Sequence, residues 1–104
     1  MNSKAKNKRA KLPFEMYLAK TFQKDWERLN RSGRYDMNAL KRVMLLLVAN
    51  DEPLPAEYLD HPLTGDYTDF KECHIGGDFL LIYTVDTKQN KIVFTRIGTH
   101  SELF

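Results

Sequence analysis

The fold is decided by residues 70–97, which read FKECHIGGDFLLIYTVDTKQNKIVFTRI. Aromatic and β-branched residues are concentrated in three runs, 70–75, 78–85 and 91–97, and such runs are typical of β-strands. The pair Gly76-Gly77 lies between the first two runs and predicts a two-residue hairpin turn. A short polar segment separates the second run from the third. This stretch therefore predicts three consecutive strands joined by tight turns.

Upstream, the hydrophobic pattern has two other periods. In residues 13–18, the apolar side chains of Phe14, Met16 and Leu18 alternate with their neighbours, which indicates a further strand. Residues 21–31 and 37–49 instead carry an apolar residue every three or four positions, which indicates two amphipathic helices. Their stripes are formed by Phe22, Trp26 and Leu29, and by Met37, Leu40, Met44 and Leu47.

The ends of the two helices carry capping signals. Thr21 and Asp36 stand where each helix begins and are the expected N-caps. Only a few residues, 32–35, connect the helices, so they are expected to form an antiparallel hairpin. Residues 51–66 contain three prolines and are predicted to be loop. The order is β-α-α-β-β-β, which predicts an α+β fold with the helical hairpin on one face of a mostly antiparallel four-stranded sheet.

Charge divides the chain into a tail and a body. The segment 1–11 contains five basic and no acidic residues, whereas the whole chain has a net charge of only +2. We therefore expect 1–12 to be a disordered basic tail and 13–104 to be a single domain. The tail could attract RNA or ribosomes through phosphate contacts, or it could serve only solubility. The body is not strongly basic, which argues against simple groove binding of nucleic acid.

The chain is expected to be cytoplasmic. No run approaches the roughly 20 apolar residues that a membrane helix needs, and no apolar segment follows the basic N-terminus as in a secretory signal. The single cysteine, Cys73, cannot form an internal disulfide, which fits a reducing compartment. A cysteine within a strand is more often a small buried hydrophobe than a nucleophile.

The candidate catalytic residues are the three histidines of the chain, His61, His74 and His100. All three lie outside the predicted helices, where functional side chains are common. Histidine can give and take a proton near neutral pH. Cleavage of RNA by its own 2′-hydroxyl needs such a base and acid, together with positive charge at the phosphate. Spacing alone leaves independent surface histidines as an equal alternative.

Several neighbours could complete such a site. A two-residue Gly-Gly turn would place His74 opposite Phe79 on one face, where the ring could stack on a base, although Phe79 could equally belong to the core. Asp78 or Glu72 could orient a histidine. Arg96 could contact phosphate or lie at a solvated edge.

A zinc site is the competing interpretation of the same residues. The histidines with Glu72 or Asp78 supply suitable ligand types. They are far apart in the sequence, however, without the close ligand pairs that usually define a zinc site. We therefore expect no metal and no cofactor.

Taken together, five motifs resemble the YafQ branch of the RelE/ParE toxin superfamily over residues 13–104. They are Leu54-Pro55, DHPLTG at 60–65, FKECH at 70–74, DFLLIY at 78–83 and RIGTHSELF at 96–104. The resemblance implies the RelE-like β-α-α-β-β-β fold and a type II toxin that cuts mRNA without metal, usually on the ribosome. It also implies a cognate antitoxin of the RelB or DinJ kind, with a ribbon-helix-helix DNA-binding segment.

The resemblance also assigns residues. His61, His74 and His100 match the functional histidines of the family, and Asp78 matches its functional aspartate. Phe104 matches an aromatic residue that shapes the site. Glu72 stands where the family also accepts aspartate, and Phe79 stands where it also has tryptophan. We expect His100 to be the principal acid or base, assisted by His74 and Asp78, with His61 at the phosphate.

Two alternatives share this fold. A ParE-like toxin blocks DNA gyrase without cutting RNA and does not need the histidine cluster. A partner-binding module that has lost activity would not need it either. The histidine set favours the endoribonuclease.

Overall fold

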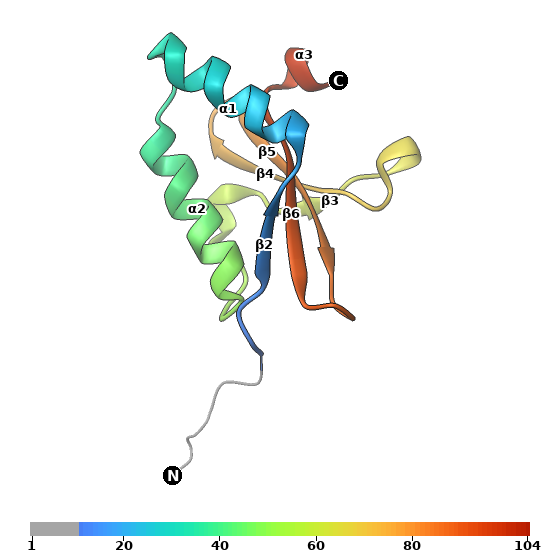
Figure 1. Cartoon of the computed structure of the whole chain (residues 1–104). Coiled ribbons are helices and arrows are strands. Elements are labelled where there is room, and N and C mark those ends of the chain that lie inside the picture. The colour runs from blue at the N-terminus through green and yellow to red at the C-terminus, as the bar shows by residue number, and fades with distance from the viewer. Residues whose placement is uncertain (1–10) are drawn as a thin grey trace.

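The computed structural model describes residues 11–104, so most of the basic tail lies outside the described part of the chain. Figure 1 shows two long helices packed beside a twisted sheet, with a short helix at the C-terminus. The elements are β2 (Glu15–Leu18), α1 (Lys20–Ser32), α2 (Met37–Ala49), η1 (Ala56–Tyr58), β3 (His61–Pro62), η2 (Gly65–Tyr67), β4 (Lys71–Gly76), β5 (Phe79–Asp86), β6 (Lys91–Thr99) and α3 (His100–Leu103).

The described strands form one sheet in the order β2-β6-β5-β4-β3. β2 runs parallel to β6, and the other neighbouring pairs are antiparallel. The α+β class and the mostly antiparallel sheet are therefore confirmed, but the sheet has five strands instead of four. The additional strand, β3, lies within the segment predicted to be loop. It has only two residues, too few to show an alternating pattern, and its Pro62 is compatible only with an edge position.

The two faces of the sheet carry hydrophobic clusters of different size. The larger cluster lies between the sheet and the helical hairpin; among its buried members are Phe22, Leu29, Leu40, Val43, Cys73, Leu81, Tyr83 and Phe94. The smaller one contains Leu80, Ile82 and Leu103, covered by Leu63 and Phe70. Because successive strand residues point to opposite faces, the smaller cluster marks the face away from the helices. We call this the open face.

The helix ends show one correct and one wrong prediction. Asp36 caps α2, and its carboxylate accepts the Ala39 N–H at 2.9 Å. Thr21 is not the N-cap of α1. The helix begins at Lys20 after Ala19, and the Thr21 hydroxyl donates to the Thr95 carbonyl at 2.7 Å. The parallel pairing of β2 with β6 brings this carbonyl close, and no local pattern reveals it.

The turn between β4 and β5 differs from the prediction by one residue. Gly77 and Asp78 form the turn, Gly76 pairs with Phe79, and His74 pairs with Leu80 across an irregularity in the register. Gly77 has a φ of +55°, which suits a glycine. His74 and Phe79 are therefore not cross-strand partners.

Among residues 11–104, no helix has the length and apolar character needed to cross a bilayer.

Candidate active site

The strand register brings two of the three histidines together on the open face. His61 on β3 pairs with Glu72 on β4, and Glu72 pairs with Ile82 of the open-face cluster. His74 lies two residues after Glu72 and therefore points to the same side. Residues that are distant in sequence thus become neighbours, as a shared catalytic role requires.

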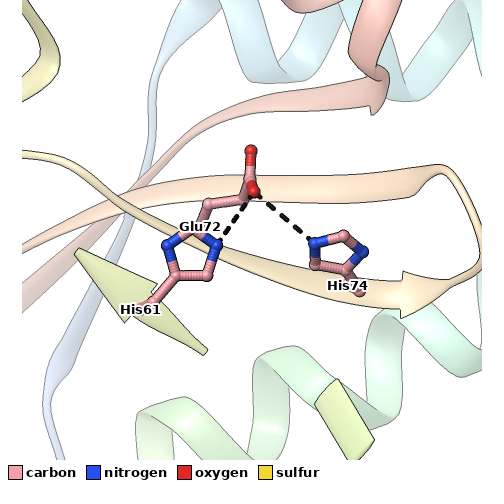
Figure 2. A group of neighbouring side chains, drawn as sticks. All are labelled: His61, Glu72 and His74. Atoms are coloured by element: carbon pink, nitrogen blue, oxygen red, sulfur yellow. Dashed lines mark hydrogen bonds and ion pairs between the residues drawn. The ribbon is translucent and has the colours of Figure 1, made fainter. Parts of the chain in front are cut away.

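Glu72 joins the two imidazoles (Figure 2). Its Oε2 atom lies 3.1 Å from His61 Nε2 and 3.5 Å from His74 Nε2. The ring centroids of the two histidines are 6.4 Å apart. Glu72 is 7% exposed, whereas the side chains of His61 and His74 are 46% and 29% exposed. A buried carboxylate therefore lies behind two imidazoles that solvent, or a substrate, can reach.

The other ring nitrogen of each histidine faces a backbone carbonyl. His61 Nδ1 lies 3.1 Å from the Pro62 carbonyl oxygen, and His74 Nδ1 lies 3.2 Å from that of Gly77. A carbonyl oxygen only accepts, so Nδ1 is the protonated nitrogen in each ring. In the neutral ring, Nε2 then carries only a lone pair; in the imidazolium form, it donates a second N–H to Glu72. Each Nε2 therefore exchanges its proton beside the Glu72 carboxylate.

His100 lies on a separate element that meets the cluster at the β4–β5 turn. It is the first residue of α3, and its backbone N–H donates to Asp78 Oδ1 at 3.1 Å. Asp78 follows Gly77, whose carbonyl accepts from His74. One turn thus anchors both His74 and His100. Asp78 acts on the backbone of His100, whereas the sequence suggested only that it orients a histidine.

α3 has a complete N-terminal capping box. Glu102 accepts from the Thr99 N–H at 2.8 Å and from the Thr99 hydroxyl at 3.1 Å. The other Glu102 oxygen accepts from Arg28 on α1 at 2.6 Å. The Thr99 backbone bond, with further help from the Thr99 hydroxyl and Arg28, lowers the pKa of Glu102 below its usual range. The predicted tail after Gly98 is therefore a short, firmly capped helix.

Phe104, together with Tyr67, forms an aromatic wall beside His100. Its ring centroid is 5.0 Å from that of His100 and 5.2 Å from that of Tyr67, which it meets edge-on. Phe104 and Tyr67 are each 43% exposed. Tyr67 is the last residue of η2, one position after the segment predicted to be loop, and no sequence signal distinguished it from the other aromatic residues.

Phe79 is not beside His74. It is 6% exposed and belongs to the helix-side core, where its ring centroid lies 4.9 Å from that of Tyr35. The prediction that Phe79 shares a face with His74 is wrong, because the turn lies one residue later than expected. The core alternative left open by the sequence describes its placement.

Arg96 does not lie at a solvated edge, the second of its two predicted environments. It occupies the same register row as Glu72 and Ile82, but its guanidinium turns to Asp25 on α1, with Nε 2.7 Å from Oδ2. Asp25 is 6% exposed and also accepts the Ile97 N–H at 3.1 Å. The hydrogen bonds from Arg96 to Asp25 raise the pKa of Arg96 above its usual value. Arg96 thus ties β6 to α1.

Cys73 is fully buried in the helix-side core, as a strand cysteine usually is. Burial raises the pKa of its thiol to about 12, with Asp60 and Glu72 adding to the shift. The thiolate needed for nucleophilic chemistry is therefore absent near neutral pH.

The two imidazoles and Glu72 form a possible metal-ligand set. One ligand atom from each of His61, Glu72 and His74 lies within 4.8 Å of the others. Both histidines present Nε2 while Nδ1 faces a carbonyl, an arrangement common among metal-ligating histidines. This set thus suits a transition metal in its donor types as well as in spacing.

Almost the whole described part of the chain matches one protein family. Residues 14–104 match the family described as "Bacterial toxin of type II toxin-antitoxin system, YafQ". This chain belongs to the YafQ toxin family. It is 43% identical over 77 residues to the mRNA interferase toxin YafQ of Escherichia coli, covering 74% of this chain and 82% of that protein.

Solved structures agree with this membership in the YafQ family. The toxin of the Escherichia coli DinJ-YafQ toxin-antitoxin complex superposes with a TM-score of 0.78 at 36% identity, covering 89% of this chain and 99% of that one. A copper-bound mutant toxin from Helicobacter pylori gives a TM-score of 0.79 at 40% identity, covering 88% and 99%. The RelE-like fold expected from the sequence is confirmed, and the gyrase-inhibiting alternative is not favoured.

Proposed function

We propose that this YafQ-family toxin is an mRNA interferase, an endoribonuclease that cuts mRNA by metal-free acid–base chemistry. The observation that carries the proposal is the placement of Glu72 Oε2 between the Nε2 atoms of His61 and His74. Curated relatives at 43% and 42% identity are named mRNA interferase toxins.

The chemistry uses the RNA's own 2′-hydroxyl as the nucleophile. A base removes the 2′-hydroxyl proton, the 2′-oxygen attacks phosphorus, and the bond from phosphorus to the 5′-oxygen breaks. An acid delivers a proton to the departing 5′-oxygen, so the products are a 2′,3′-cyclic phosphate and a 5′-hydroxyl. A base, an acid and a source of positive charge at the phosphate meet all the requirements of this step.

We assign these roles according to position. His100 is the principal acid or base, because it is exposed on α3 and its ring lies beside the exposed ring of Phe104. The cluster of His61, Glu72 and His74 faces the phosphate and supplies the complementary proton transfer and charge. A histidine that donates from both Nδ1 and Nε2 is the imidazolium, the form that would bring positive charge to the phosphate.

Base recognition is assigned to the aromatic wall. Phe104 and Tyr67 lie edge-on, and Phe104 also lies against His100. Single-stranded RNA is commonly recognised by stacking unpaired bases on exposed aromatic rings. A base held here would place its own ribose and phosphate close to His100.

The same proposal includes the partners. In Escherichia coli, YafQ forms a toxin-antitoxin complex with DinJ, and we infer a cognate antitoxin for this chain as well. The mRNA is cut while it is engaged on a ribosome, so the toxin acts in the cytoplasm.

Induction of the wild-type protein and of His100→Ala, followed by primer extension on cellular mRNA, tests this function. The wild type is expected to arrest growth and to produce new 5′ ends within coding regions. His100→Ala is expected to be tolerated and to leave transcripts intact. Growth arrest by His100→Ala with the same cut sites would contradict the mechanism, and growth arrest with inhibited supercoiling and intact mRNA would favour a gyrase inhibitor.

We also propose that His61, Glu72 and His74 can bind a transition metal ion. The inward-facing Nε2 atoms and the copper-bound relative from Helicobacter pylori both support this proposal. Titration of the protein with Cu²⁺ in a calorimeter tests it, with His61→Gln expected to weaken binding by about tenfold or more. Equal affinity of both proteins would contradict it.

A further inference from the structure

A second polar cluster, formed by Asp60, Lys71 and Tyr83, lies next to His61 in the chain but takes no part in the chemistry above. The Tyr83 hydroxyl donates to Asp60 Oδ1 at 2.5 Å, and the Lys71 ammonium donates to Asp60 Oδ2 at 3.1 Å. Lys71 Nζ also lies 5.7 Å from the centroid of the Tyr83 ring. Both carboxylate oxygens of Asp60 are therefore engaged.

Tyr83 anchors this cluster in the hydrophobic core. Its side chain is 1% exposed and packs in the helix-side core, with its ring centroid 6.4 Å from that of Phe94. Burial and the bond to Asp60 raise the pKa of the Tyr83 hydroxyl, so this hydroxyl keeps its proton and remains a donor. Asp60 is thus hydrogen-bonded to a fully buried residue of the helix-side core.

His61 has little restraint from its own strand. β3 contains only His61 and Pro62, at the edge of the sheet, and Pro62 has no N–H to donate to β4. The preceding segment from Asn50 to Asp60 contains a single turn of 3₁₀ helix. Backbone pairing alone would therefore leave the His61 imidazole poorly fixed.

Strand alternation explains how the cluster can act without touching RNA. Pro62 pairs with Lys71, and Lys71 pairs with Tyr83, so this register row lies beside the row that contains His61 and Glu72. Consecutive strand residues point to opposite faces. Asp60 can therefore be held on the helix side while His61 reaches Glu72 on the open face.

We propose that Asp60, anchored by Tyr83 and Lys71, is a positioning residue that holds His61 in register with Glu72 and His74. The effect of this positioning on the rate of RNA cleavage rests on the proposed endoribonuclease function. Its structural consequence, the orientation of the His61 ring, does not depend on that function.

Two variants that keep side-chain shape test the proposal, Tyr83→Phe and Asp60→Asn. A displacement of about 1 Å in a catalytic group can cost on the order of a hundredfold in rate. We expect each variant to lower the cleavage rate at saturating RNA by about tenfold, because the fold still restrains His61 in part. The RNA concentration for half-maximal rate should change little. Tyr58→Phe, which removes a hydroxyl from the same loop, is the matched control.

A double-variant comparison separates positioning from a general loss of stability. When His61→Ala has already removed the imidazole, Tyr83→Phe has nothing left to position and should not slow cleavage further. An equal slowing by Tyr83→Phe in the wild-type and His61→Ala backgrounds would overturn the proposal. Rates are measured on ribosomes programmed with a defined mRNA, at a temperature where all variants are folded.

NMR of the imidazole rings tests the proposal in the free protein. Tyr83→Phe and Asp60→Asn should shift the ring signals of His61 and leave those of His100 in place, whereas Tyr58→Phe should shift neither. Unchanged His61 signals in both test variants would overturn the proposal. Shifted His61 signals in a protein that cuts no RNA would support the positioning role and count against the endoribonuclease function alone.

Discussion

Adding one methyl group at Gly98 should loosen the helix that carries His100 without replacing any catalytic side chain. Gly98 is buried in β6 opposite Leu80, and a Cβ at this position would lie 2.9 Å from Glu102 Oε1 and 3.4 Å from Leu103 Cδ2. The Gly98 backbone is outside the left-handed region, so alanine can adopt its conformation. The effect of Gly98→Ala must therefore come from the contact with Glu102.

The structure sets the size of this effect. The Glu102 atom that the methyl group would displace accepts hydrogen bonds from both the Thr99 N–H and the Thr99 hydroxyl. Glu102 Oε1 is the far end of a flexible side chain and can move away from the methyl group, so the main cost is the lost helix cap, about 0.5–2 kcal/mol. The stiffer unfolded chain of the alanine variant returns about 0.4–1 kcal/mol. We expect Gly98→Ala to lower the free energy of unfolding by about 1 kcal/mol, with α3 loosened first.

Urea unfolding and single-turnover cleavage together measure this effect. Gly98→Ala should lower both stability and the cleavage rate, because α3 carries His100 and leads to Phe104. Gly76→Ala is the matched control, since a Cβ there meets nothing within 4 Å. Once Glu102→Ala has removed the carboxylate, the cost of Gly98→Ala should largely disappear. Identical stability and rate for Gly98→Ala and Gly76→Ala would refute the reasoning.

Three further predictions concern charge and burial. Asp25→Ala should lower the free energy of unfolding by about 3 kcal/mol, because it leaves Arg96 and the Ile97 N–H without their buried acceptor. Urea unfolding measures this, and a decrease in stability no greater than that of the helix-cap variant Asp36→Ala would contradict the prediction. Burial raises the pKa of Cys73 to about 12, so the folded protein should resist alkylation by iodoacetamide at about pH 8. A labelling time course followed by mass spectrometry checks this. Labelling of the folded protein as fast as of the protein in urea would contradict the prediction. The Thr99 backbone bond lowers the pKa of Glu102 in the folded protein below the ordinary value of 4.5. The Glu102 carboxylate therefore stabilises α3 fully above pH 4.5, and this stabilisation is lost as the pH falls through the lower pKa of the folded state. Amide NMR signals of α3 should show this acid transition in the wild type, and an equal transition in Glu102→Gln would argue against it.

The parts of the fold that depend on local pattern could be predicted from the sequence. The helical hairpin, the three long strands and the Asp36 cap each depend on residues a few positions apart. β3 could not be predicted, because its place at the sheet edge is set by pairing with β4. The turn was misplaced by one residue because Gly76-Gly77 and Gly77-Asp78 are both good turn pairs.

The candidate site shows the same division between local and long-range information. The residue types indicated acid–base chemistry, and the resemblance selected the histidines, but only the strand register places His61 and His74 on one Glu72 oxygen. The ion pair of Arg96 with Asp25 and the anchor of Asp60 on Tyr83 join distant segments. Neither pair leaves a periodic signal in the sequence.

The end groups of the cleaved RNA test the central claim most directly. A defined mRNA on programmed ribosomes is cut in a single turnover by the wild-type protein, with and without a 2′-deoxy substitution at the nucleotide before the cut. The mechanism predicts a 2′,3′-cyclic phosphate and a 5′-hydroxyl from the normal RNA and no cleavage of the 2′-deoxy RNA at that site. A 3′-hydroxyl with a 5′-phosphate, or unchanged cleavage of the 2′-deoxy RNA, would contradict it.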